Sequence, residues 1–245
     1  MHSGIYTAYS GLKAQMEALD ILAGNLANVN TTGFKEQRAF FSALDTAMGA
    51  SEAGPLDAAI NTHAVLSGSA LDAGDGLPVA THRDLDVALS GPGFLTVETP
   101  AGIRYTRNGS LTTDAGSVLC TAEGYPVLGE NGRILIGPGK VDINQDGEIH
   151  VAGAQAGRLK LAVVERPGSL RREGHSLFVP PAEGQPPAAQ LKATVRQGYL
   201  EQSNVNPVLS TVRMVAIMRH FEAIQKSVNL MFNEMDAKSI ERLGR

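Results

Sequence analysis

The sequence has a single cysteine, Cys120, which excludes intramolecular disulfides and cysteine-rich zinc sites. It also lacks an apolar run of about 18 residues, the length that a membrane-spanning helix needs. Its first residues show no basic start, apolar stretch and cleavage site of a secretory signal peptide. A formal net charge of −4 gives no broad attraction to nucleic acid. We therefore expect a globular protein with no membrane anchor and no cleaved signal.

The motifs that usually carry chemistry are incomplete. Six histidines include no H-x-x-x-H pair of the kind that binds zinc. Residues 142–148 begin like a calcium loop, but Gly153 stands where the closing glutamate belongs. Ser10 and Lys13 have S-x-x-K spacing without the further motifs of penicillin-binding enzymes. We predict no catalytic residue, no cofactor and no metal, and we expect Cys120 to be buried in a strand as a small apolar side chain.

The N-terminal residues carry apolar side chains at alternating spacings of four and three, which is the a/d pattern of a coiled-coil helix. The pattern predicts a helix from about Ile5 to Asn28 with one face that needs a partner helix. Its positions are Ile5, Tyr9, Leu12, Met16, Leu19, Ala23 and Leu26.

The stretch NLANVNTTGFK, residues 25–35, follows this helix directly. Asn30 tolerates a left-handed backbone, the threonines bond to nearby backbone groups, and Gly33 carries no Cβ. The stretch predicts a helix stop followed by a fixed turn, after which Phe34 packs back on whatever the turn faces.

A related stretch, SNVNPV at residues 203–208, precedes a second long helical pattern. Asn206 suits a helix N-cap, and Pro207 suits the first helical position because its missing N–H is not needed there. The helix then repeats the heptad spacing at Met214, Ile217, Phe221, Ile224, Val228, Met231 and Met235.

The middle of the chain changes character twice. Residues 45–80 have few large apolar side chains and predict an extended connector. Residues 81–199 show short apolar alternations separated by hairpin-type dipeptides, which predict a central antiparallel β domain. The predicted fold is α+β, with residues 1–44 and 200–245 forming an elongated coiled-coil domain. The dipeptides are Asn108-Gly109, Asn131-Gly132 and Asp146-Gly147.

Two such helices would be marginally stable by themselves. In each helix, burying the seven apolar side chains of the heptad stripe contributes about 14 kcal/mol to the free energy of folding. Ordering some two dozen residues of that helix costs roughly 1 to 2 kcal/mol per residue in backbone entropy. Neighbouring chains are the natural source of further burial, so the sequence indicates an assembling protein.

Four segments together resemble the flagellar basal-body rod family, which is shared by proximal rod, distal rod and hook proteins. They are GIYTAYSGLKAQ, LDILAGNLANVNTTGFK, the central RDLDVALSGPGFLTVE with YTRNGSLTTDAGSVL, and GYLEQSNVNPV. The resemblance implies a structural subunit that polymerises helically through its terminal helices into the periplasmic rod of the basal body. It implies as partners copies of the chain, other rod proteins and the flagellar type III export apparatus, with no nucleic acid and no membrane insertion.

The residues expected at subunit contacts are the two heptad stripes and the polar positions of the two asparagine stretches. Beyond the stripes, they are Asn25, Asn28, Asn30, Thr31, Gly33, Phe34, Ser203, Asn204, Asn206 and Pro207.

Two other interpretations remain at this point. Within the family, the opening GIYTA and the short connector favour a proximal rod subunit, with a distal rod or hook-type axial protein as the alternative. In another class, residues 85–199 would be a periplasmic carbohydrate-active or carbohydrate-binding β domain. That interpretation predicts a concave pocket with a perturbed carboxylate pair.

Overall fold

The computed structural model describes residues 2–44, 63–164, 167–174, 176–179 and 193–243. It divides into two compact units. Unit 1 takes residues 1–26, 38–69 and 207–245, and unit 2 takes residues 27–37 and 70–206. The asparagine turn and the residues just before the last helix therefore belong with the central strands, whereas we expected them in the helical domain.

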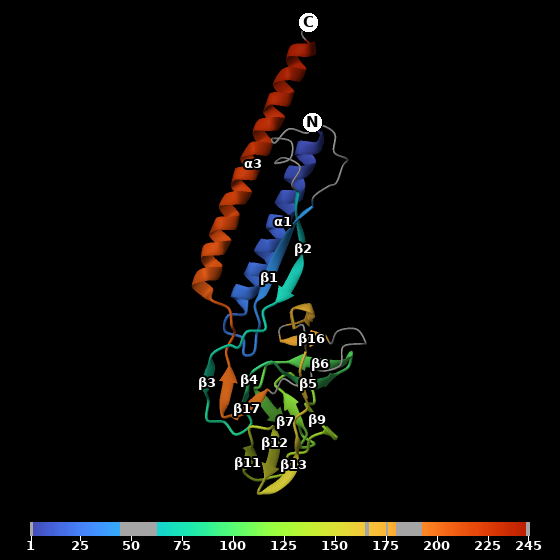
Figure 1. Cartoon of the computed structure of the whole chain (residues 1–245), viewed down its shortest axis with the longest axis vertical. Helices are drawn as coiled ribbons and strands as arrows, with labels where there is room; N and C mark the ends of the chain where they lie inside the picture. Colours follow the sequence, from blue (N-terminus) through green and yellow to red (C-terminus); the bar gives the residue numbers. More distant parts are fainter. Residues whose placement is uncertain (1, 45–62, 165–166, 175, 180–192, 244–245) are drawn as a thin grey trace. The chain divides into compact units, whose positions relative to one another are not determined.

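Unit 1 contains the two long helices and a two-stranded sheet (Figure 1). Helices α1 (His2–Ala27) and α3 (Pro207–Leu243) lie side by side and run in opposite directions, and β1 (Gln37–Leu44) pairs with β2 (His63–Leu71). These bounds confirm both predicted helices, including the start at Pro207. Part of the predicted extended connector forms strand β2 instead. Its sequence, HAVLSGSAL, is held in an extended conformation by pairing with β1. Residues 45–62 of that connector lie outside the described residues.

Unit 2 is built from short antiparallel strands, which confirms the predicted α+β class. Its largest sheet has the order β14-β5-β6-β16-β15, with bounds Leu161–Ala162, Phe94–Thr99, Gly102–Thr106, Leu177–Val179 and Arg171–Glu173. A three-stranded sheet joins β11 (Val141–Ile143), β12 (Glu148–Val151) and β13 (Ala154–Arg158). Four strand pairs complete the unit: β3 (Pro78–Ala80) with β18 (Tyr199–Glu201), β4 (Val87–Ser90) with β17 (Thr194–Gln197), β7 (Leu111–Thr113) with β8 (Leu119–Thr121), and β9 (Leu128–Gly129) with β10 (Gly132–Arg133). Residues 167–169 form a short 3-10 helix.

Two of the three predicted hairpin turns are confirmed. Asn131-Gly132 lies at the turn between β9 and β10, and Asp146-Gly147 lies between β11 and β12, so the calcium-like run is a hairpin. The prediction for Asn108-Gly109 is wrong. The Gly109 carbonyl accepts the Val87 N–H at 3.0 Å, and a Cβ at Gly109 would lie 1.7 Å from the Val87 oxygen. Glycine serves there for close approach of two backbones.

The apolar core of unit 2 explains why these short strands hold together. One cluster gathers inward side chains of the five-stranded sheet and of the smaller sheets, including Val97, Leu119 and Ile149, all essentially inaccessible to solvent. A second cluster packs Phe94 edge-on to Phe178, with ring centroids 5.5 Å apart. Cys120 is buried in β8, as predicted, and burial raises the pKa of its thiol.

Candidate subunit-interaction site

Helix α1 turns inward a face made mostly of small residues. Ala14, Ala18 and Leu22 are buried and follow one another at intervals of four residues, so they share one face. Gly11 continues the same face, and a Cβ added to it would lie 3.9 Å from the Ile224 Cδ1 atom of α3. Because these side chains are short, the Ile224 side chain of α3 comes close to the α1 backbone at Gly11.

The predicted heptad stripe is not the inner face of α1. Tyr9 remains 67% exposed and Met16 remains 55% exposed. Leu12, Leu19 and Leu26 are half-buried, and Ala23 is exposed. At about 100° per residue, the stripe lies roughly a third of a turn from the buried small residues. The chain's own fold therefore covers this stripe only in part, and its packing as a coiled coil stays a prediction.

Helix α3 behaves differently on its predicted stripe. Met214, Ile217, Phe221, Ile224 and Val228 are all half-buried, and Ser210 on the same face is buried. The side chains of Ile5, Met231 and Met235 lie outside the described part of the structure.

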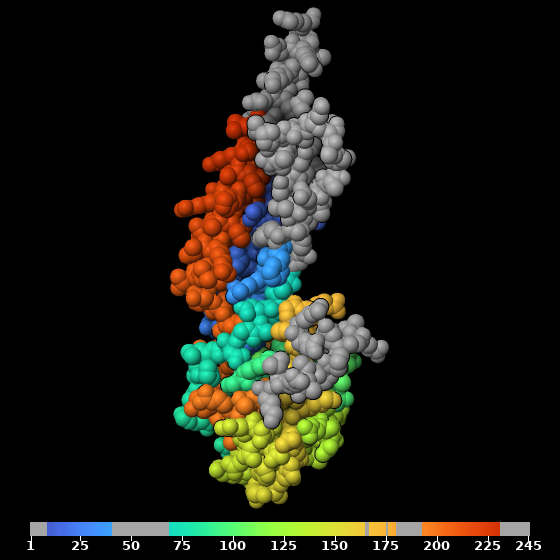
Figure 2. Space-filling model, in the orientation of Figure 1, coloured from blue at the N-terminus to red at the C-terminus, as the bar shows by residue number. Residues whose placement is uncertain are grey.

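A second apolar face lies on α3 roughly half a turn from that stripe. Val208 is 72% exposed, and Val212 and Val215 on the same face are also exposed. Further along this face come the exposed Arg219 and Lys226, followed by Leu230, which is 65% exposed. The side chains of α3 project from the molecular surface in the space-filling view (Figure 2). Helix α3 therefore has more apolar surface than its own chain covers.

The asparagine turn folds as predicted at its start, but its end has a further role. The Thr31 N–H donates to the Asn28 carbonyl at 3.1 Å, and the Thr31 hydroxyl donates to the Asn28 Oδ1 at 3.2 Å. The left-handed residue is Gly33, with φ of +68°, whereas we assigned left-handed tolerance to Asn30. Phe34 is buried, as expected, beneath the guanidinium of Arg172, whose carbon lies 4.5 Å from the ring centroid.

The second asparagine stretch meets the first inside unit 2. The Asn204 N–H donates to the Phe34 carbonyl at 3.3 Å, and the Glu36 N–H donates to Asn204 Oδ1 at 2.7 Å. The Asn204 amide nitrogen donates to the carbonyls of Asp72 and Gly74 at 3.0 and 3.1 Å. The structure thus brings Gly33, Phe34 and Asn204 together.

The other expected contact positions of the two stretches differ in their exposure. Asn25 is buried in α1, while Asn30, Asn206 and Pro207 are exposed. The Ser203 hydroxyl accepts only the nearby Val205 N–H, at 3.3 Å, among the contacts that the described structure gives it.

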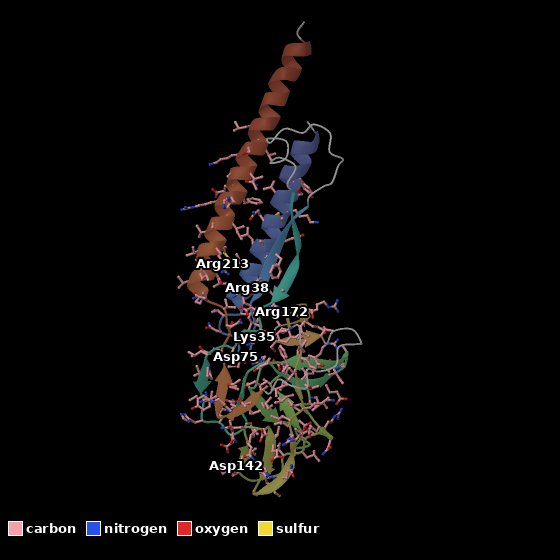
Figure 3. All side chains as sticks on the ribbon, in the orientation of Figure 1. Lys35, Arg38, Asp75, Asp142, Arg172 and Arg213 are labelled. Atoms are coloured by element: carbon pink, nitrogen blue, oxygen red, sulfur yellow. The ribbon has the colours of Figure 1, made fainter. Side chains whose placement is uncertain are left out.

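Three charged residues that sequence reasoning missed lie beside this contact. Lys35, Arg107 and Glu201 are each at most 1% exposed. The Lys35 Nζ donates to Glu201 Oε1 at 2.5 Å, and Arg107 donates to Glu201 Oε2 at 3.1 Å. Arg107 also pairs with the partly exposed Asp75, at 3.4 Å. Lys35 and Asp75 are labelled in Figure 3. Burial lowers the pKa of Lys35, and the negative charge of Glu201 opposes that change.

In the described residues, the carboxylates with a shifted pKa are paired with arginines, which does not support the alternative of a carbohydrate site. The carboxylates with lowered pKa are Glu98 and Glu173, and each accepts a hydrogen bond from an arginine, Arg133 or Arg104, which causes the shift. One broad depression is lined by the loops around His82, Thr113, Ser117 and Gly137. Within the described residues, no group of three or more His, Cys, Asp or Glu side chains could hold a metal ion. No described helix is long and apolar enough to cross a membrane.

Comparison with known proteins gives a consistent picture along the chain. Residues 5–35 match the family model described as flagella basal body rod protein, residues 88–151 match the flagellar hook protein FlgE/F/G D1 domain, and residues 196–241 match the flagellar basal body rod FlgEFG protein C-terminal region. The chain is 33% identical to the flagellar basal-body rod protein FlgF of Caulobacter vibrioides, covering 97% of each chain. It is 35% identical to FlgF of Escherichia coli over 94% of each chain. It is 32% identical to the rod protein FlgG of Buchnera aphidicola from Schizaphis graminum, covering 94% of this chain and 95% of that one.

Proposed function

Because this chain belongs to the flagellar basal-body rod protein family and is a structural subunit of the rod, we propose that it joins the rod through the apolar faces of α1 and α3 that its own fold leaves exposed. The observation that carries this proposal is the position of the α1 stripe. Tyr9 and Met16 are more than half exposed, although their spacing is that of a helix-packing face.

The exposed side chains of the α1 stripe, Tyr9 and Met16, are best explained as part of a surface that another chain covers. An apolar stripe that continues for several helical turns costs solubility unless it is buried in an assembly. The small residues of α1 already serve the contact with α3, through Gly11 and Ile224. The two roles are thus divided between two faces of one helix.

The second apolar face of α3 gives the complementary half of the proposal. Its half-buried stripe faces inward in unit 1, and Val208, Val212 and Val215 face outward. Two different surfaces, one on each helix, suit a heterologous contact in which one surface of a subunit meets the other surface of the next. Such a contact repeats without closing and produces a filament. Helical polymerisation and coiled-coil packing of the terminal helices are parts of this proposal.

We assign the remaining properties by analogy with the family. The relatives include both FlgF and FlgG proteins at similar identity, and we propose the proximal rod as the position of this subunit. Its partners would be copies of itself and other rod proteins in the periplasm. The flagellar type III export apparatus would deliver it without a cleaved signal peptide, and we propose no enzymatic role.

The test is complementation of an in-frame deletion in the organism that carries the gene. Met16→Asp places a charge in the α1 stripe, and Lys13→Asp places the same side chain on an exposed part of α1 outside the stripe. We expect Met16→Asp to abolish swimming and complete rods in purified basal bodies, and Lys13→Asp to restore both. Since Met16 is more than half exposed, the helix content of the isolated variant should equal that of the wild type.

Two results would contradict the proposal. Complete rods containing the Met16→Asp chain would show that the stripe is not buried in the assembly. Intact rods in the deletion strain, with no related protein replacing the missing chain, would remove the assignment as a rod subunit.

A further inference from the structure

We propose that Lys35, Arg107 and Glu201 form an ionic clamp that locks together the two chain segments leading to α1 and α3. The first, called the leading segment, is residues 27–37, which follow α1. The second, called the trailing segment, is residues 199–206, which precede α3. Both belong to unit 2. This inference rests on the proposed function for its mechanical consequence, but the clamp itself is a property of the isolated chain.

The two segments are hydrogen-bonded to each other between residues 33–36 and residues 201–204. The Gly33 N–H donates to the Glu201 carbonyl at 2.8 Å, and the Asn204 N–H donates back to the Phe34 carbonyl at 3.3 Å. The Glu36 N–H extends the contact to the Asn204 side chain. The chain therefore enters and leaves unit 2 at neighbouring points.

The Glu201 carboxylate joins the segments from within. Its Oε1 accepts from the Lys35 Nζ at 2.5 Å and from the Gly76 N–H at 2.7 Å, and its Oε2 accepts from Arg107 at 3.1 Å. Three donors on one buried carboxylate satisfy most of its acceptor capacity. Removing that charge leaves two buried cations without their shared partner, which is far more costly than losing an exposed ion pair.

Arg107 fixes this centre to the body of unit 2. Its guanidinium donates to the carbonyls of Leu89 and Gly91 and lies over the Phe94 ring, with its central carbon 5.3 Å from the centroid. Phe94 begins β5, the second strand of the five-stranded sheet. The clamp thus ties both segments to the sheet as well as to each other.

Two glycines mark places where the backbones around the clamp are tightly packed. A Cβ at Gly33 would lie 2.3 Å from the Arg107 carbonyl carbon, and a Cβ at Gly76 would lie 1.9 Å from the Gln202 carbonyl oxygen. Backbones this close cannot slide past one another without breaking the hydrogen bonds around them. A pull on either segment is therefore carried by the whole cluster.

We infer from this arrangement that the clamp positions the connections of the two terminal helices and carries load between them and the central strands. Lys35 and Glu201 are 166 residues apart in the sequence. The clamp forms only in a chain that contains both Lys35 and Glu201. Both segments therefore become ordered only after the chain has been synthesised as far as Glu201.

The test is amide hydrogen exchange in the full chain. In Glu201→Gln, we expect the amides of Gly33, Glu36 and Asn204 to exchange at least tenfold faster than in the wild type. Glu98→Gln is the matched control, because it removes the carboxylate of the exposed pair with Arg133 in the same unit. That control should leave the three amides unchanged.

A second variant keeps the test decisive if Glu201→Gln does not fold. Lys35→Met removes one donor and leaves Glu201 with Arg107 and the Gly76 N–H. It should accelerate exchange of the same three amides. Unchanged exchange in Glu201→Gln, or in Lys35→Met where Glu201→Gln does not fold, would overturn the clamp.

The mechanical consequence is measured separately, as swimming speed and rod breakage in medium of raised viscosity. We expect clamp variants to form rods that fail under load at least twice as often as rods with Glu98→Gln. If their exchange accelerates but their rods perform like the wild type, the load-bearing role is refuted while the subunit assignment stands. Intact rods in the complete deletion would instead refute the proposed function.

Discussion

Replacing Gly33 with alanine tests how closely the leading segment crosses the chain at Arg107. Gly33 has φ of +68°, and an added Cβ would lie 2.3 Å from the Arg107 carbonyl carbon and 2.4 Å from the Asn108 nitrogen. Gly124→Ala is a matched control in unit 2, because Gly124 has φ of +85° and no heavy atom within 4 Å of the added Cβ.

The two substitutions share one cost and differ in another. A left-handed backbone costs alanine about 1 kcal/mol more than glycine, and this applies to both positions. Only Gly33→Ala must also displace packed backbone, which costs a further ~1 to 3 kcal/mol. The free energy of unfolding of unit 2 should therefore fall by about 2 to 4 kcal/mol in Gly33→Ala and by about 1 kcal/mol in Gly124→Ala.

Hydrogen exchange of core amides in the full chain measures this difference. The Leu119 and Val127 amides are suitable, because they donate to Ile134 and Leu119 carbonyls in the core of unit 2. Since about 1.4 kcal/mol corresponds to a tenfold change, these amides should exchange roughly 30-fold to 1000-fold faster in Gly33→Ala and about fivefold faster in Gly124→Ala. Equal acceleration in the two variants would show that the turn does not press against the Arg107 backbone.

Three further predictions concern unit 2. A fragment of residues 27–206 should give a dispersed amide NMR spectrum, whereas residues 81–199 should not, because that fragment lacks both carboxylate partners of the buried Arg107, Asp75 and Glu201; a dispersed spectrum from the shorter fragment would refute this. The pKa of Glu98 is lowered because Arg133 donates to it, so the pair stabilises the chain at neutral pH and this contribution disappears as the pH falls through the lowered pKa. Arg133→Met should return the pKa towards its ordinary value in a carboxyl NMR titration, and an unchanged pKa would contradict the assignment. Cys120, whose burial raises the thiol pKa, should react with iodoacetamide more than tenfold more slowly in the folded chain than in denaturant; equal rates would argue against its burial.

The sequence was sufficient to predict both helices and the inner face of α3, but not the inner face of α1. Alternating apolar spacing and Pro207 defined α1 and α3 closely, because helix limits depend on local chemistry. The choice of inner face depends on which surfaces fit together. On α1 that choice favoured Gly11, Ala14 and Ala18, whose small size gives almost no signal in a hydrophobicity pattern.

The clamp could not have been predicted from residue patterns. Arg107 and Glu201 are 94 residues apart, and single charged residues in a sequence are usually exposed. The nearest signal was position: Lys35 ends the first asparagine stretch and Glu201 comes just before the second. The similar sequences of the two stretches indicated that they have related roles, but they did not show that the stretches are in contact.

Their meeting explains why these stretches are rich in small polar residues. Two backbone segments that pack together in a buried crossing must satisfy N–H and C=O groups that no regular sheet pairs. The Asn204 side chain alone accepts from the Glu36 N–H and donates to two carbonyls, and Gly33 permits the approach that these bonds require. An apolar residue at either position would leave such groups unpaired, at a cost of about 1 to 3 kcal/mol each. The asparagine stretches thus stabilise the subunit internally, and the exposed apolar side chains of α1 and α3 remain available for contacts with other chains.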